Sequence, residues 1–397
     1  MDSKLLGSIL LIVGTSIGAG MLALPIVSAQ LGFMGSLMLL VACWMVMTLS
    51  AFILLEANLW LPHNSNIISM AKATIGPVGQ LLAWVTYLLL LYSLLCAYIA
   101  GGSDLFRNLL SFAHIQLPEW LSSVLFTVVF SAIVYLGIHS VDHVNRGLMF
   151  IKLTAYSLLI LLLVPFISVP QLTGGHMSEI TSITAIMVTI TSFGFSVIVP
   201  SLRIYFADDV KKLKKAIFWG SFVPLVCYVL WDAAIMGVIP LGGAHGLGAM
   251  VHSPTSTSDL VNTLTTTANS GFVNLFAKLF TSVCILTSFL GVGLCLSDFW
   301  SDGLQLEKKG KNRLIIQAIA FAPPLAIVLF FPHIFIRALA YAGIYCLMLQ
   351  VIIPVWMVWN GRYRRGIGKG FYVPGGKVLL LVLGVLSITM IIRNFLS

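Results

Sequence analysis

The sequence Gly14-Thr15-Ser16-Ile17-Gly18-Ala19-Gly20 lies in the middle of the first long apolar run, which extends from about Leu5 to Ala29. Three glycines and two hydroxyl residues in seven positions are unusual for a continuous membrane helix, because glycine costs a helix interior about 0.8–1 kcal/mol relative to alanine. Inside a bilayer, backbone that leaves the helical pattern is tolerated only where protein or a wet cavity satisfies it. The stretch therefore predicts a broken helix, and Pro25 limits the helix beyond the break.

A break in the middle of the membrane presents free amide N–H and carbonyl groups, and the half-helix ends concentrate partial charges of opposite sign. Such a place can bind a zwitterion, with a carboxylate on the N–H groups and an ammonium on the carbonyls. The alternative is a small-residue motif that lets two helices approach closely. This stretch by itself leaves both interpretations open.

The composition defines the class of protein. Of the 397 residues, 59% are hydrophobic and 9% are charged, and the mean hydropathy is +1.03, which predicts an all-α polytopic membrane protein with a single domain over residues 1–397. We expect no cleavable signal peptide, because the first apolar run is too long for one. The net charge of +9 lies in short loops and so indicates membrane orientation rather than nucleic-acid binding. The six cysteines lie in apolar runs without metal-binding spacing, so we expect reduced packing residues and no metal site.

Eleven apolar runs are long enough to span a membrane. They cover about 5–30, 33–58, 79–106, 121–139, 144–168, 181–204, 215–240, 272–300, 314–331, 334–359 and 376–395. The runs are continuous rather than alternating, which predicts helices and excludes a β-barrel.

The lysine and arginine distribution predicts the orientation. With the N-terminus inside, the inward loops hold 17 basic residues and the outward loops hold 3, and such a bias places the basic side in the cytoplasm. Eleven spans then place the C-terminus outside. Within the long outward segment 241–271, Ser256 to Ala268 predicts a short surface helix. In the inward loop 207–212, an aspartate is expected to cap the following helix.

A second interruption lies in the sixth span, Thr191-Ser192-Phe193-Gly194-Phe195-Ser196, followed by Pro200. It lies five spans after the first, and an odd number of spans per unit inverts the second unit relative to the first. A pair of interrupted spans at matching places in two halves is the best sequence indicator of a transporter's binding site. The alternative is an ordinary proline-kinked helix.

Lys152 lies about six residues into the fifth span. A charge near the bilayer centre costs about 2.5–3.5 kcal/mol unless it faces a wet interior. The lysine either snorkels to the inner surface or is buried, where it can bind and release a proton or take the place of a sodium ion.

Other polar residues of the spans have structural interpretations as well as functional ones. Asp232 and Lys278 lie at equal depth, which allows a structural ion pair. Thr287 and Ser288 either face a cavity or bond back to their own helix. Glu56, Asp104 and Asp298 lie at span ends and are expected to be interfacial.

The stretch from Gly14 to Pro25 resembles the first-helix motif of the hydroxy/aromatic amino acid permeases, and most of all the tyrosine-specific and tryptophan-specific permeases of bacteria. Further matches keep their order along nearly the whole chain: Thr191-Ser192-Phe193-Gly194-Phe195, Val199-Pro200-Ser201, Thr287-Ser288-Phe289-Leu290-Gly291-Val292, Pro323-Pro324-Leu325-Ala326 and Tyr341-Ala342-Gly343.

The resemblance implies the LeuT-type five-plus-five inverted repeat of the amino acid–polyamine–organocation superfamily. Repeat one would cover about 5–168, repeat two about 181–359, and an extra helix about 376–395. It also implies proton-driven uptake across a bacterial inner membrane, by rocking of the first, second, sixth and seventh spans against the rest.

The resemblance further implies the site residues. The substrate carboxylate would bind the N–H groups of Gly18, Ala19 and Gly20. Its ammonium would meet carbonyls near Thr15, Ser16 and Ile17 and at Ser192 and Phe193, beside Gly194. Lys152 matches the lysine that occupies the sodium position in proton-coupled relatives, and Thr287 and Ser288 match the eighth-helix face of that position. Ser196 is a departure, because aromatic permeases of this kind typically have a histidine there. Phe193 and Phe195 offer rings for stacking on an aromatic guest or for a hydrophobic gate.

The sequence thus predicts a proton-coupled symporter for an aromatic amino acid, with tyrosine first, and leaves tryptophan, serine/threonine or branched-chain substrates open. A channel would need a polar filter, and none is present in the sequence. An enzyme would need catalytic motifs such as HExxH, which are also absent from it. Beyond the proton as coupling ion, the amino acid and the lipid bilayer, we expect no cofactor, nucleic acid or obligate protein partner.

Overall fold

The computed structural model describes residues 3–112, 114–175 and 181–396, and these residues form helices and connecting loops without a strand. The helices are α1 (Ser3–Ser16), α2 (Ala19–Ser28), α3 (Gly32–Leu59), α4 (Ile67–Thr74), α5 (Pro77–Phe112), α6 (Glu119–Tyr135), α7 (Ile138–Leu163), α8 (Val169–Leu172), α9 (Ile183–Ser192), α10 (Val199–Phe206), α11 (Val210–Val238), α12 (Leu247–Met250), α13 (Ser256–Ala268), α14 (Gly271–Leu304), α15 (Gly310–Phe330), α16 (Phe335–Leu347), α17 (Ile353–Tyr363) and α18 (Gly376–Leu396).

Within the described residues, nine helical stretches are long and apolar enough to cross a membrane. The difference from the eleven predicted runs has two causes. The first run is divided between α1 and α2, and α2 continues into α3 as one stretch of 41 residues. The fourth run forms α6, which has only 17 residues. The all-helical, multi-pass class is confirmed, whereas eleven spans and a five-plus-five repeat stay predictions.

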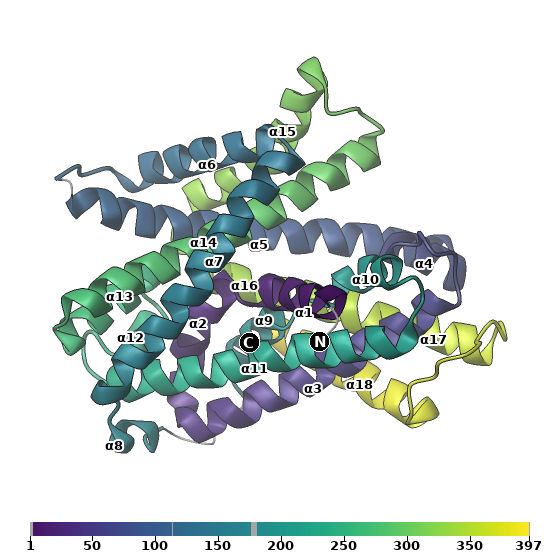
Figure 1. The fold of residues 1–397 in the computed structure, drawn as a ribbon, viewed down its shortest axis with the longest axis horizontal. Coiled ribbons are helices and arrows are strands. Elements are labelled where there is room, and N and C mark those ends of the chain that lie inside the picture. The colour runs from purple at the N-terminus through teal and green to yellow at the C-terminus, as the bar shows by residue number, and fades with distance from the viewer. Residues whose placement is uncertain (1–2, 113, 176–180, 397) are drawn as a thin grey trace.

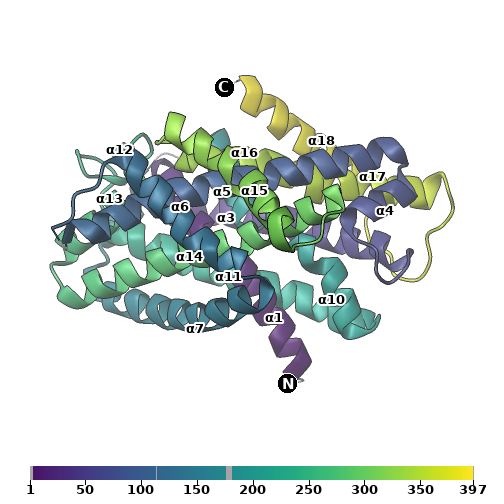
Figure 2. The same ribbon diagram turned by 90° about the horizontal axis from the view of Figure 1, so that it is seen from above.

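The broken helices lie at the centre of a bundle of long helices. Helices α3, α5 and α11 run across the view of Figure 1, with α1, α2 and α9 between them. Helix α2 packs on α9, α1 on α11, and α14 on α7 and α5. The short helices α12 and α13 lie at one end of the bundle and α4 and α10 at the other, in both views (Figures 1 and 2). We call these the predicted outward and inward ends, from the charge distribution.

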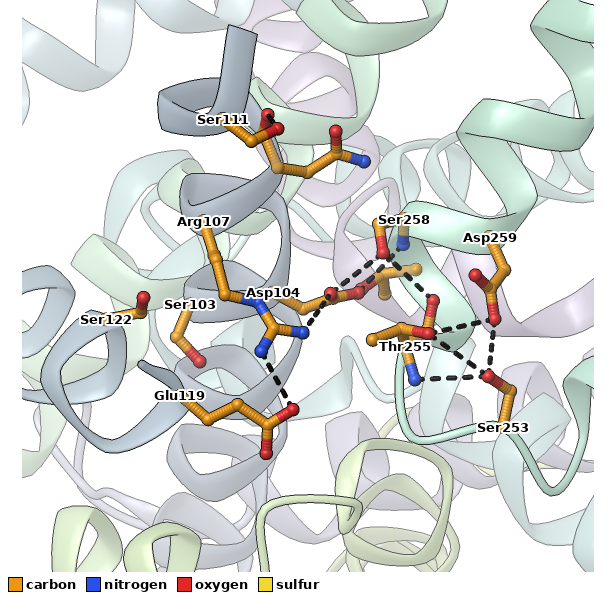
Figure 3. Close-up of polar contacts among 12 residues, drawn as sticks. Ser103, Asp104, Arg107, Ser111, Glu119, Ser122, Ser253, Thr255, Ser258 and Asp259 are labelled. Carbon is orange, nitrogen blue, oxygen red and sulfur yellow. Dashed lines mark hydrogen bonds and ion pairs between the residues drawn. The ribbon is translucent and has the colours of Figure 1, made fainter. Parts of the chain in front are cut away.

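The surface helix predicted at Ser256–Ala268 is confirmed as α13. Asp104, at the predicted outward end of α5, fastens this helix to the bundle (Figure 3). Its carboxylate accepts hydrogen bonds from Ser258 N (2.8 Å), Ser258 Oγ (2.8 Å) and Thr257 Oγ1 (2.5 Å). Asp104 therefore caps the first turn of α13 from another helix, which is the same interaction that a local N-cap makes.

At the predicted inward end, Asp209 caps α11 by accepting a hydrogen bond from Lys212 N (3.1 Å), as predicted for this loop. Arg203 of α10 donates to Asp208 Oδ1 (2.5 Å), to Leu61 O (3.0 Å) and to Asn58 O. The hydrogen bond from Arg203 lowers the pKa of the exposed Asp208 carboxyl, so the carboxylate stays ionised to lower pH than an ordinary aspartate. The broken sixth helix is thereby attached to the end of α3.

The expectation that Glu56 is interfacial is wrong, because this side chain is completely buried. Arg362 at the end of α17 donates to it through Nε (2.6 Å) and Nη2 (2.5 Å), and Val373 N adds a third hydrogen bond (2.7 Å). Span ends do not have to be interfacial where another chain segment folds over them, and the segment before α18 does so here.

We expect Glu56→Gln to destabilise the protein by about 3–5 kcal/mol, because it leaves the Arg362 guanidinium nearly buried without its counter-charge. Thermal denaturation of the purified protein in detergent measures the loss. Glu119→Gln is the matched control, since its carboxylate is 48% exposed beside Arg107 and such pairs contribute less than about 1 kcal/mol. Equal loss in both variants would contradict a structural role for the buried pair.

Candidate functional site

The first break lies where it was predicted. Helix α1 ends at Ser16, and Gly18 adopts an extended conformation (φ −149°, ψ −156°) before α2 begins at Ala19. Met21 N donates to Gly18 O (3.1 Å), whereas in a continuous helix it would donate to Ile17 O. The carbonyl of Ile17 is therefore released from the helical pattern.

Lys152 of α7 binds this released carbonyl. Its Nζ donates to Ile17 O (2.6 Å) and to Thr287 Oγ1 (3.3 Å) on α14, and the side chain is completely buried. The snorkelling alternative is wrong for this structure, because the ammonium lies inside the bundle. It lies between the first break and α14, each more than one hundred residues from Lys152 in the sequence.

The next residue of α14 binds the other side of the break. Ser288 Oγ accepts a hydrogen bond from Ala19 N (3.1 Å), the first amide of α2. Thr287 and Ser288 also donate to Cys284 O, at 3.0 and 2.9 Å. Each hydroxyl thus bonds back to its own helix, as one of the two alternatives predicted, and also contacts a group at the first break. That the two hydroxyls face a cavity stays a prediction.

The second break lies between α9 and α10. Helix α9 ends at Ser192, a 3₁₀ turn covers Ser196–Ile198, and α10 begins at Val199. Pro200 lies in the first turn of α10, where a missing N–H removes no hydrogen bond. The alternative of a continuous helix with a proline kink is therefore wrong.

The two breaks meet, and Tyr228 of α11 lies between them. Its hydroxyl is 2.6 Å from Ser16 O and 2.8 Å from Ser192 O. Its ring is completely buried and packs edge-on against Phe193, with centroids 5.1 Å apart. Sequence reasoning missed this residue, and the only available signal was that a buried tyrosine hydroxyl needs a partner.

Gln350 holds the second break and was also missed. Its Oε1 accepts hydrogen bonds from Ser196 Oγ (2.8 Å) and Ser196 N (3.2 Å), and its Nε2 donates to Gly194 O (3.4 Å). The residue lies in a π-helical turn, Met348–Ile352, and such turns occur frequently at functional sites. Ser196, at the position of the expected histidine, is thus bonded to a buried amide.

The remaining predicted residues differ in burial. Ile17, Phe193, Phe195 and Ser196 are completely buried, and Ser192 is nearly so, so the breaks are closed off in this conformation. Thr15 is exposed, and its hydroxyl donates back to Ile12 O (2.8 Å). The Thr15 side chain therefore takes no part in the cluster around the breaks.

The suggested ion pair between Asp232 and Lys278 is not formed in the described part of the chain. Asp232 is bonded to Ser36 of α3 through Oδ2, and its Oδ1 has no hydrogen-bond partner among the described residues. Equal depth in two helices was therefore insufficient to predict a contact.

The fold and site define a class. A multi-pass helical membrane protein with two central breaks, whose main-chain polar groups face one another, has the construction of a membrane transport protein. Comparison with known proteins identifies the family: residues 1–394 match the tryptophan/tyrosine permease family, and the chain belongs to it.

Three relatives cover nearly the full length. The chain is 35% identical over 400 residues to tyrosine-specific transport system 1 of Haemophilus influenzae, covering 98% of each chain. It is 32% identical to tyrosine-specific transport system 2 of the same species, covering 100% of this chain and 97% of the relative. It is also 32% identical to glutamine transporter 2 of Aliivibrio fischeri, covering 92% and 91%. The protein is a transport protein of this family and not an enzyme.

We expect Gly18→Ala to prevent correct closure of the first break. A Cβ at residue 18 would lie 2.3 Å from Ser288 Oγ, so the hydroxyl must move away and lose its hydrogen bond from Ala19 N. Uptake of labelled amino acid and thermal stability should both fall. Gly7→Ala, in α1 and with no atom within 4 Å of its new Cβ, is the matched control.

The double variant Gly18→Ala/Ser288→Ala should recover part of the lost stability, because the clashing oxygen is gone and the Ser288 Cβ lies at ordinary contact distance, 3.6 Å. A double variant that is no better than the sum of its parts would show that the two residues do not interact.

Proposed function

We propose that this protein is a proton-coupled symporter that imports an aromatic amino acid, tyrosine first, by alternating access. Support for the substrate comes from the family and from the two Haemophilus influenzae relatives, which are named tyrosine-specific transport systems. The observation that carries the coupling is the Lys152 ammonium, which is bonded to the carbonyl released by the first break.

The amino acid head group would use the main chain of both breaks. Its carboxylate would accept hydrogen bonds from the N–H groups of Gly18, Ala19 and Gly20. The hydrogen bond from Ala19 N to Ser288 would break to allow this. Its ammonium would take the carbonyls of Ser16 and Ser192, which the Tyr228 hydroxyl now contacts. Substrate binding would then exchange one set of hydrogen bonds for another, without exposing bare backbone.

The side-chain pocket would lie beside the second break. Phe193 and Phe195 are buried there, and Phe193 already packs on Tyr228. Offset or edge-on contact between aromatic rings contributes about 0.5–1.5 kcal/mol beyond burial, which favours an aromatic guest.

Lys152 would couple this site to the proton. As an ammonium it supplies a positive charge to Ile17 O and Thr287 Oγ1, where a sodium ion lies in other carriers of the fold that the sequence resembles. Loss of its proton removes that charge and weakens the hydrogen bonds from Lys152 to Ile17 O and Thr287 Oγ1. A proton would thus be needed to stabilise the closed break in each cycle.

For the architecture we propose eleven spans in two inverted units of five, about 5–168 and 181–359, with an extra helix at 376–395. The N-terminus would be cytoplasmic and the C-terminus periplasmic in a bacterial inner membrane. The charge bias supports this orientation, and the position of the Lys-rich first turns of α11 at the opposite end from α13 is consistent with it.

A second candidate substrate class is a non-aromatic amino acid, because one similar relative is named a glutamine transporter. The Ser196–Gln350 contact favours it as well, since it leaves a polar amide at the second break. Tryptophan, serine/threonine and branched-chain amino acids are further alternatives.

Lys152→Ala should abolish accumulation of tyrosine in proteoliposomes that carry an imposed proton gradient, because the charge on Ile17 O is lost. Lys309→Ala, at a side chain that is 85% exposed, should accumulate tyrosine like the unmodified protein. Uptake that requires sodium and ignores a protonophore would overturn the coupling.

Unlabelled tyrosine should compete with labelled tyrosine more strongly than serine, leucine or glutamine do, since only an aromatic side chain can form a ring contact with Phe193. The same proteoliposomes with a panel of competitors measure the order. Stronger competition by glutamine would move the assignment to the second candidate class.

A further inference from the structure

A row of oxygen atoms ties the predicted outward end of α2 to α3 and α11, away from Lys152. Asp232 Oδ2 on α11 contacts Ser36 Oγ on α3, Ser36 Oγ lies 3.1 Å from Ser28 Oγ on α2, and Ser28 Oγ lies 2.6 Å from Leu24 O. The three side chains are at most 2% exposed. The transport mechanism proposed above leaves this row without a role.

The number of protons in the row decides the state of Asp232. Four oxygens form three successive contacts, and each contact needs one proton between its oxygens. The Leu24 carbonyl can only accept, so Ser28 donates to it. Ser36 must then donate to Ser28, and the contact between Ser36 and Asp232 has a proton only if the carboxyl supplies it.

An ionised carboxylate fits the row badly. It would draw the Ser36 hydroxyl toward itself and leave two oxygens 3.1 Å apart without a proton between them. It would also be a buried charge without a counter-ion, because no cation lies within ion-pair distance of Asp232 among the described residues, and its Oδ1 has no hydrogen-bond partner there. Burial of an unpaired charge is far more costly than burial of a neutral acid.

The surroundings of Asp232 supply no alternative charge partner. From α7, Tyr156 lies close enough to Asp232 to interact with it electrostatically, but its hydroxyl donates to Cys227 O (2.8 Å). Lys278 lies two residues from Phe280, the α14 ring that meets Trp231, and residues two apart do not share a helix face. Other ionisable side chains on helices packed against α11 are engaged elsewhere or lie at the inward end. They are Lys152 with Ile17, Glu56 with Arg362, Arg203 with Asp208, Asp259 with Ser253, Lys4 at the start of α1, and His139, His143 and the Asp142–Arg146 pair in the first turns of α7.

We propose that Asp232 is a neutral carboxylic acid and forms a proton-binding site separate from Lys152. With the proton present, the row is fully bonded and holds α2 against α3 and α11. Loss of the proton removes one hydrogen bond from the row and places a negative charge among three helices. The predicted outward end of the broken first helix is thus closed by a bound proton.

Infrared difference spectroscopy of the full-length protein in lipid vesicles at neutral pH tests the proposal, because a protonated carboxyl has a carbonyl stretch well separated from carboxylate bands. Asp232→Asn should remove a protonated-carboxyl band. Asp142→Asn, at a 54% exposed aspartate paired with Arg146, is the control and should remove carboxylate bands instead. Loss of carboxylate bands in Asp232→Asn would overturn the proposal.

A second variant keeps the test decisive if Asp232→Asn folds poorly. Ser36→Ala removes the acceptor of the acid proton and should shift the same band to higher frequency without abolishing it. An unshifted band would show that Ser36 is not the hydrogen-bond partner of the Asp232 carboxyl, and it would overturn the proposed row of hydrogen bonds. Neither measurement depends on transport. Failure of tyrosine uptake or of proton coupling through Lys152 would therefore leave their outcome unchanged.

Discussion

Every main-chain polar group that leaves a helix in the middle of a membrane must find another partner, because no water is present in the hydrocarbon to replace it. The centre of this protein is organised by that requirement. Two breaks release the carbonyls of Ser16, Ile17 and Ser192 and the amides of Ala19 and Ser196. The side chains that bind them are Tyr228, Lys152, Ser288 and Gln350.

These four side chains come from four different helices, which explains why the bundle is needed to form the site. Lys152 is on α7, Tyr228 on α11 and Ser288 on α14, and Gln350 lies in the π-helical turn that follows α16. Each of these helices packs against one of the broken ones or against its direct neighbour. A shift of any one of them changes the pairing of backbone groups at the breaks, so the position of the helices and the state of the site are linked directly.

The sequence predicted the breaks and their polar surroundings for a local reason. Glycine and hydroxyl residues at 14–20 and 191–196 disfavour a continuous helix wherever they stand, so their effect does not depend on the rest of the fold. Lys152 was predicted because a charge in an apolar run is conspicuous by itself. Tyr228 and Gln350 were missed because a single polar side chain in an apolar run gives no indication of its helix face or its partner. The errors at Glu56 and at the Asp232–Lys278 pair have the same origin: depth along a helix follows from the sequence, and lateral neighbours do not.

Lys152 and Asp232 are buried and ionisable and, unlike the buried Glu56, are each held by groups without formal charge. The lysine is bonded to a carbonyl and a hydroxyl, whereas the aspartate is bonded to a hydroxyl only. A formal ion pair between them would be stable in one geometry and costly to separate, which suits a static core better than a protein that must change shape. Partners that are neutral dipoles bind each group strongly enough to satisfy it and weakly enough to be exchanged. A site that must release its ligand on one side of a membrane and bind it on the other depends on that balance, and here the exchangeable partners are main-chain carbonyls and side-chain hydroxyls.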